Sequence, residues 1–92
     1  MDHFDGEAVV LAGNSVVCRG IAHLDLEDRA GGWTGVVEAP SAFDRRSPFP
    51  LSLMRLRLIP SGREATVIGY PYHGSAHRLK MMSAPGSQAL WQ

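Results

Sequence analysis

The strongest constraint on the fold of this chain is a pair of turn signals, each set between runs of alternating apolar and polar residues. The first signal is Gly13-Asn14, which follows the run Glu7 to Ala12 and precedes the run Ser15 to Glu27. Glycine and asparagine tolerate the positive φ angles that a two-residue β-hairpin turn requires. We therefore predict that the two runs are antiparallel strands joined by this turn.

The turn also predicts the register of this hairpin. With Gly13 and Asn14 at its centre, Leu11 faces Val16 and Val9 faces Cys18. Every second residue of the following strand is small or apolar, which predicts that one side of the strand faces a core. These residues are Val16, Cys18, Gly20, Ala22, Leu24 and Leu26. A shift of the strand register by one residue would expose this whole set to water. The turn and the alternation therefore predict the same register. We interpret Gly20 as a bend in the long strand.

The second turn signal is Pro60-Ser61-Gly62-Arg63, which lies between the runs Leu51 to Ile59 and Glu64 to Tyr70. Proline suits the first corner of a turn, and glycine accepts a left-handed conformation near its end. We predict a second antiparallel hairpin in which Leu56 faces Val67.

Alternation predicts two more strands, at Trp33 to Ala39 and at Ala76 to Met82, with Trp33 as the largest core candidate. The segment Pro40 to Pro50 holds three prolines, so we interpret it as a long loop. The six strands predict an all-β fold, a small six-stranded antiparallel meander barrel or sandwich, with closure into a barrel favoured because it hides strand edges. We expect one domain over residues 1–92, with residues 83–92 as a C-terminal tail.

The composition limits the classes of function. Nine Lys and Arg residues balance nine Asp and Glu residues, whereas proteins that bind nucleic acid usually carry an excess of positive charge. The same balance removes a barrier to self-association. Cys18 is the only cysteine, so we predict a small buried hydrophobe there rather than a disulfide or a nucleophile. The first residues lack the features of a signal peptide and no run is long enough to span a membrane, which predicts a cytoplasmic protein.

Two histidines, His73 and His77, have the spacing that brings imidazoles together on a helix for metal binding. No helix is predicted here, so we favour two exposed loop histidines over a metal site. A third ligand would have to come from elsewhere in the chain; the candidates are His3, His23, Cys18 and Asp25.

Several charged residues fall on predicted outer faces. A stripe of positive charge that binds an anionic partner would form if the strands of its members were neighbours, and Tyr70 and Tyr72 would then offer aromatic surfaces beside it. A solvated strand face that discourages aggregation explains the same residues. The positive set is Arg19, Arg55, Arg57, Arg78 and Lys80, and an acidic patch comprises His23, Asp25, Glu27 and Asp28.

The tail carries an apolar pair, Leu90-Trp91, close to the C-terminus. Such a pair either packs on its own domain or anchors in a groove of a partner, because an indole in water forgoes about 2 kcal/mol of burial free energy. We favour packing on the same domain.

The sequence shows no Ser-His-Asp arrangement, glycine-rich phosphate loop or nucleophile elbow. We therefore predict a non-catalytic module that binds a protein partner or a second copy of itself, without a cofactor, and expect neither nucleic acid nor membrane as partner. The alternative is a small barrel that holds a small molecule or metal between the Pro40 to Pro50 loop and the Tyr70 to His77 segment, with minor enzymatic activity. The candidate contact surface comprises Trp91, Leu90, Tyr70, Tyr72, His73, His77, Arg55 and Arg57.

Overall fold

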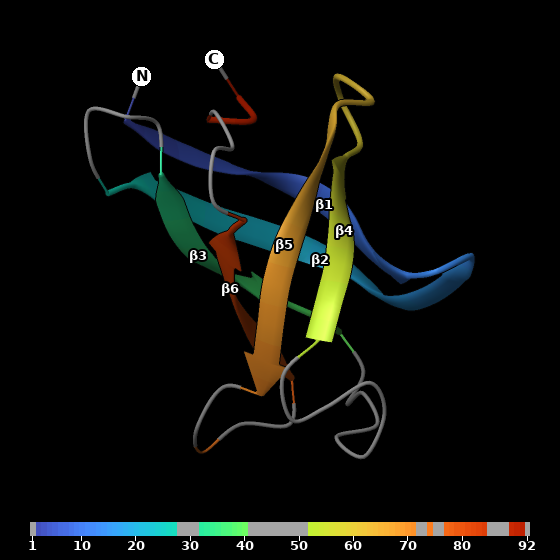
Figure 1. Cartoon of the computed structure of the whole chain (residues 1–92). Coiled ribbons are helices and arrows are strands. Elements are labelled where there is room, and N and C mark those ends of the chain that lie inside the picture. The colour runs from blue at the N-terminus through green and yellow to red at the C-terminus, as the bar shows by residue number, and fades with distance from the viewer. Residues whose placement is uncertain are drawn as a thin grey trace.

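A computed structural model of the chain describes residues 2–27, 32–40, 52–71, 74, 77–84 and 89–91. It forms a closed barrel in which the strands follow the order β1-β2-β3-β6-β5-β4 (Figure 1). The described residues contain no helix. The prediction of an all-β, six-stranded antiparallel fold is confirmed, with the barrel and not the sandwich as its form. The strands are β1 (His3–Ala12), β2 (Ser15–Leu26), β3 (Trp33–Glu38), β4 (Ser52–Leu58), β5 (Glu64–Pro71) and β6 (Arg78–Ser83).

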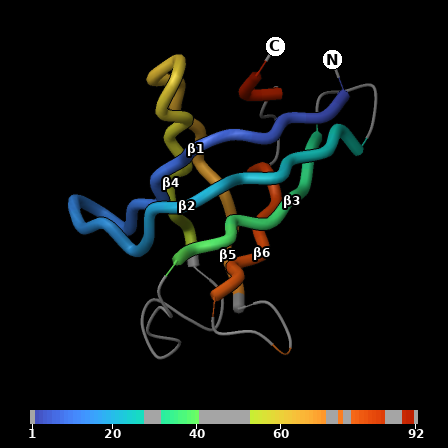
Figure 2. Tube along the Cα trace, turned by 180° about the vertical axis from the view of Figure 1, so that it is seen from behind, coloured from blue at the N-terminus to red at the C-terminus, as the bar shows by residue number. Residues whose placement is uncertain are grey.

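The connectivity differs from the predicted meander at one connection. A meander would pair β3 with β4, but β3 pairs with β6 and β4 pairs with β1. The barrel therefore consists of two three-stranded units, β1–β2–β3 and β4–β5–β6, and Figure 2 shows the strands of the first unit, blue to green, running next to one another. Connections that are short in sequence favour pairing of the neighbours within each unit, whereas the long connection between β3 and β4 leaves that pairing to packing.

The core is built from the inward-facing residues of all six strands. Trp33 is only 1% exposed and is the largest fully buried side chain, as predicted. Among the described residues, no polar or charged side chain is buried. The fully covered aliphatic and thioether side chains around Trp33 are Val10, Leu24, Val37, Leu56, Leu58, Val67, Leu79 and Met81.

A β-bulge interrupts the first hairpin. Leu11 faces Val16, as the turn predicts, but the next pair is Val10 with Cys18. Val17 is therefore an extra residue in β2 that has no pairing partner in β1. A bulge of this kind shifts the register by one residue for the rest of the ribbon.

The bulge makes two sequence predictions wrong. Val9 lies opposite Arg19 and not opposite Cys18, and Ala8 and Val10 enter the core in its place. Val16, predicted to face the core, is 62% exposed. The remaining inward-facing predictions for β2 hold, since Cys18, Ala22 and Leu24 lie beyond the bulge on one continuous alternation and are all buried.

The second hairpin forms with a different register from the predicted one. Leu56 lies opposite Ala65, and Val67 lies opposite Met54, two residues from the predicted pairing. A shift of two residues keeps every side chain on its predicted face. Leu56 and Val67 are accordingly both buried.

The turn explains this shift. The Leu58 amide donates to the Arg63 carbonyl over 2.9 Å, and the Gly62 amide donates to the Leu58 carbonyl over 2.8 Å. The loop is thus Ile59 to Gly62, with Gly62 as its last residue at a φ of 72°. Arg63, which we had placed inside the turn, is paired across the hairpin instead.

Candidate functional site

Within the described part of the chain, one edge of β2 is left without a partner strand over part of its length. β1 pairs with β2 along nearly its whole length, but β3 pairs only with the part from Ile21 to Leu26. From Ser15 to Arg19 no strand among the described residues pairs with the second edge of β2. In this region β1 remains paired with β4 from Ala8 to Leu11, whereas β2 continues past the end of β3, from Ser15 to Arg19 (Figure 1). We call this segment the open edge. An unpaired edge offers backbone donors and acceptors to another strand.

Local packing ends β3 where the open edge begins. A Cβ atom on Gly20 would lie 1.9 Å from the Glu38 carbonyl oxygen, so only glycine permits this close approach. The next amide, that of Ala39, donates to the His77 carbonyl over 2.8 Å and so turns away from β2. Pro40 follows and has no amide hydrogen to donate.

A surface groove of about 520 Å³ lies beside the open edge. Ile21, which is 41% exposed, contributes to its apolar surface. Its three charged residues are already paired: Arg19 lies 3.6 Å from Glu7, and Arg78 from outside the groove lies 3.2 Å from Glu38. The lining residues are Glu7, Arg19, Gly20, Ile21, Glu38, Ala39 and Pro40.

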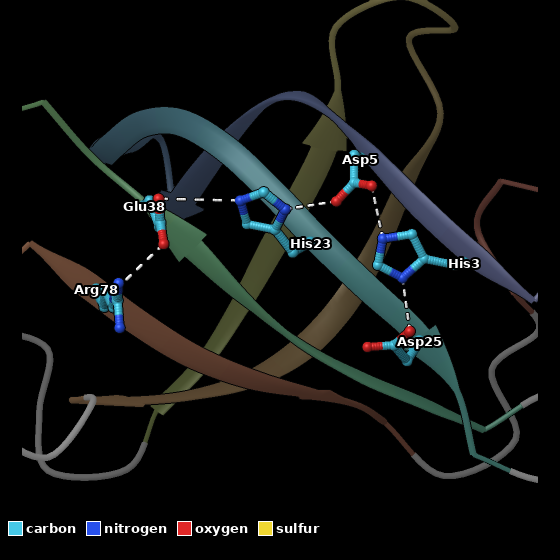
Figure 3. Close-up of polar contacts among 6 residues, drawn as sticks. All are labelled: His3, Asp5, His23, Asp25, Glu38 and Arg78. Atoms are coloured by element: carbon cyan, nitrogen blue, oxygen red, sulfur yellow. Dashed lines mark hydrogen bonds and ion pairs between the residues drawn. The ribbon is translucent and has the colours of Figure 1, made fainter.

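A chain of polar contacts crosses the outer face of the barrel from β1 to β6 (Figure 3). The His3 imidazole lies 2.6 Å from Asp25 through Nδ1 and 2.6 Å from Asp5 through Nε2. His23 contacts the other oxygen of Asp5 over 2.5 Å and lies 3.9 Å from Glu38. We call this the polar row; its members are His3, Asp5, His23, Asp25, Glu38 and Arg78.

The electrostatics of the polar row follow from these contacts. The hydrogen bond to Asp25, and then that to Asp5, raise the pKa of His3 above its ordinary value. The hydrogen bond to His23 lowers the pKa of Asp5, with a smaller effect from His3. In their side-chain contacts both imidazoles meet only carboxylates within the described part of the chain. The row links adjacent strands.

The polar row as a unit was not predicted from the sequence. The first strand was predicted to start at Glu7, whereas β1 begins at His3. The available signal was the polar alternation His3, Asp5, Glu7, which continues the outer face of the strand. Even so, the predicted register would have placed Asp5 opposite Ala22, and only the bulge brings it opposite His23.

The predicted stripe of positive charge is interrupted by carboxylates. Arg55 and Arg57 each lie 2.8 Å from Glu64 on β5. Arg55 also donates to the Gly13 carbonyl over 2.6 Å and so ties the first turn to β4. The hydrogen bond from Arg57, ahead of the charge of Arg55, lowers the pKa of Glu64. These arginines stabilise strand pairing and do not present a continuous cationic surface.

The remaining polar candidates divide into described and undescribed residues. The Tyr70 ring lies 5.9 Å from the Lys80 ammonium, and the His77 ring lies 3.3 Å from the Ala39 carbonyl. Tyr72, His73, Asp28 and residues 41–50 of the predicted loop lie outside the described residues, and with them the His73–His77 pair.

Cys18 lies in the core and is 8% exposed, which confirms the prediction of a small buried hydrophobe. Burial raises the pKa of its thiol to about 11. A thiol with so high a pKa is almost wholly protonated near neutral pH and is a poor nucleophile.

The C-terminal pair packs on its own barrel, as we favoured. The Trp91 ring centroid lies 5.9 Å from that of Trp33, edge to face, and 6.4 Å from that of Phe4, stacked. Leu90 is buried against the core. A smaller cavity of about 330 Å³ borders this cluster and the Pro60 turn. Residues 89–91 thus cover one end of the barrel. The Trp91 indole, which we had considered as an anchor in a partner's groove, packs on its own chain.

Comparisons with known proteins found no match to this chain among family models, curated proteins or solved structures. Within the described ranges, no group of three His, Cys, Asp or Glu side chains has a metal-binding arrangement. The same ranges hold no helix long and apolar enough to cross a membrane.

Proposed function

We propose that the protein is a non-catalytic module for protein binding or self-assembly, and that it engages its partner by strand addition at the open edge of β2. The observation that carries the proposal is the unpaired stretch from Ser15 to Arg19 beside the groove. Strand addition obtains affinity from main-chain hydrogen bonds and specificity from neighbouring side-chain pockets.

The side chains near the open edge suit binding better than catalysis. Val16 and Ile21 expose apolar surface, and the charges of Arg19 and Glu38 are compensated by neighbours. The only cysteine is buried, and the histidines of the polar row contact carboxylates. Apolar surface rimmed by compensated charge is typical of a contact patch.

The alternative function, binding of a small molecule, is supported by the groove volume. Its value of about 520 Å³ falls within the range of known ligand sites. A thermal-shift screen with metabolite and metal collections tests this alternative, since a ligand that binds only the folded state raises the unfolding temperature. A ligand that raises the unfolding temperature of the wild type but not that of Ile21→Ser would favour small-molecule binding over strand addition.

Peptides selected from a random display library test the proposed function. We expect extended peptides to be enriched on the protein, and to shift the amide resonances of Ser15 to Arg19 when bound. Val16→Lys should weaken their binding about tenfold or more, because an edge lysine opposes strand addition. The matched control is Leu53→Lys, which alters a residue that is 70% exposed on β4. Peptide binding that leaves the open edge unperturbed would refute the proposal, as would absence of both peptide binding and self-association.

A further inference from the structure

We infer that the cavity of about 330 Å³ at the covered end of the barrel binds a small aromatic carboxylate. The ring of this ligand rests against Phe4 and Trp91, and its carboxylate against the Arg63 guanidinium. We call this site the end cavity. It shares no lining residue with the groove beside the open edge, so the inference goes beyond the proposed function and does not depend on it. The residues that line the end cavity are Phe4, Leu58, Pro60, Ser61, Arg63, Leu90 and Trp91.

Two aromatic side chains provide the apolar surface for the ring. Phe4, near the start of β1, and Trp91, in the C-terminal segment, are stacked with their ring centroids 6.4 Å apart and an angle of 27° between the ring planes. Both side chains are only partly buried and so keep surface for a third ring. Leu58 and Leu90 line the same cavity and are 2% and 8% exposed. A flat apolar ring therefore meets aromatic and aliphatic surface that the fold already holds in place.

The charge of the lining selects an anion. Arg63 is the only charged residue among those that line the end cavity. Its neighbour in the chain, Glu64, lies 2.8 Å from both Arg55 and Arg57, so that carboxylate is already paired. The groove beside the open edge differs, because two carboxylates line it together with one guanidinium. A lining with a guanidinium and no carboxylate favours a ligand that brings a carboxylate, to which the planar fork of arginine can donate two hydrogen bonds.

The second hairpin turn holds the polar side of the end cavity. The Arg63 carbonyl accepts a hydrogen bond from the Leu58 amide over 2.9 Å, and the Arg63 amide donates to Ser61 Oγ over 3.2 Å. These bonds fix the backbone at Arg63, while the residue itself is exposed to ligands in solution. A hydroxyl that accepts a hydrogen bond still has its own hydrogen to donate, so Ser61 offers a second donor from the same turn.

The volume limits the size of the ligand. A volume of about 330 Å³ lies at the small end of the range for ligand sites in proteins. One or two rings with a short acidic substituent suit such a site, whereas a dinucleotide cofactor is too large. The ligand class is therefore the small aryl carboxylic acids.

Two probes of nearly the same shape and different charge test the inference. Phenylacetate carries the carboxylate, and phenylacetamide has a neutral amide in its place. Titration of each probe into the full chain, followed by nuclear magnetic resonance, gives its affinity and the residues that it contacts. We expect phenylacetate to shift the resonances of Ser61, Arg63 and Trp91, and to bind about tenfold more tightly than phenylacetamide, because hydrogen bonds between charged groups are the stronger ones.

Three variants separate the contributions to binding. Arg63→Gln should weaken phenylacetate binding about tenfold and leave phenylacetamide binding unchanged. Lys80→Gln is the matched control, because it also removes one positive charge, at an exposed position on β6 that does not line the end cavity, and it should change neither affinity. Phe4→Leu keeps an apolar side chain but removes a ring, and should weaken both probes about threefold. Far-ultraviolet circular dichroism checks that each variant is folded.

Four results would overturn the inference. They are absence of phenylacetate binding at millimolar concentrations, equal affinities of the wild type for the two probes, phenylacetate binding that Arg63→Gln leaves unchanged, and resonance shifts confined to the groove around Ile21. None of them bears on strand addition at the open edge, because the peptide test of that proposal uses other residues and other ligands.

Discussion

His3 on β1 and Asp25 on β2 are cross-strand partners, and their side chains meet over 2.6 Å. The second nitrogen of the same imidazole lies 2.6 Å from Asp5. A neutral imidazole has only one N–H, so donation to both carboxylates requires the protonated ring. The contact that ties the start of β1 to β2 is therefore complete only when His3 is charged.

The stability contributed by His3 should depend on pH. Its pKa is raised in the folded state above the ordinary value of 6.5. Its contribution is therefore fully present below about pH 6.5 and is lost as the pH rises through the folded-state pKa. We expect His3→Gln to lower the unfolding temperature at about pH 5.5 and to have a smaller effect at about pH 9, as measured by thermal denaturation.

Nuclear magnetic resonance can follow the same group directly. The His3 ring should titrate with a midpoint above 6.5 in the folded protein, and Asp25→Asn should lower that midpoint because it removes the strongest cause of the shift. A His3 midpoint at or below the ordinary value would contradict this account of the polar row.

Glu64 should give the opposite pH dependence. The arginines on β4 lower its pKa from the ordinary value of 4.5, so its contribution is present above that pH and is lost as the pH falls through the folded-state pKa. The difference in unfolding temperature between wild type and Glu64→Gln should therefore shrink on acidification. Added salt should also reduce it at neutral pH, because the pairs are exposed to solvent. A difference that grows in acid would show the assignment to be wrong.

Removal of the Trp91 side chain should destabilise the barrel. Trp91→Ala deletes the contacts with Trp33 and Phe4, and we expect a loss of about 1–3 kcal/mol, less than for a fully buried tryptophan. Urea denaturation measures this free energy of unfolding. Leu53→Ala, at a position that is 70% exposed, is the control and should change it by less than about 0.5 kcal/mol. Equal effects of the two variants would mean that the tail does not cover the barrel end in solution.

A methyl group at Gly20 should be costly. Because the Cβ of Gly20→Ala would lie 1.9 Å from a backbone oxygen of Glu38, β2 and the end of β3 must move apart. Overpacking of this kind costs about 1–3 kcal/mol, again measurable in urea. Gly62→Ala is an informative comparison, since its strain would come only from a φ of 72° with no atom near the new Cβ. A neutral Gly20→Ala would argue against the close approach that ends β3.

The sequence predicted the strands and most of their buried faces, but not their exact partners. Alternation alone placed Cys18, Ala22, Leu24 and Trp33 in the core, because the period of two is a property of each strand by itself. Pairing depends on details that the alternation does not contain. Glycine can adopt a left-handed backbone conformation at more than one position of a turn. In the structure Gly62 is the last residue of the loop, and the cross-strand partner of Leu56 is therefore Ala65 and not the predicted Val67.

The candidate site was harder to predict for the same reason. Residues 15–19 contain no glycine or proline that would mark a bulge at Val17, and β-branched residues fit a regular strand equally well. Yet this one residue exposes Val16 and also brings Asp5 opposite His23. The open edge depends further on where β3 stops, which is decided by contacts between Gly20 and a strand distant in sequence.

Two strand pairings close the barrel, β1 with β4 and β3 with β6, and we call them the seams. They also bear on how the chain folds. The hairpins within each three-stranded unit join neighbouring segments, whereas the seams join Ala8 with Leu58 and Glu38 with Arg78. Contacts between residues so far apart in sequence carry a large loop-closure entropy and slow the folding of β proteins. We therefore expect the two units to form their hairpins first and the seams to close late. Until then both outer edges of each unit are available to other chains, so refolding at high protein concentration is the step most prone to aggregation.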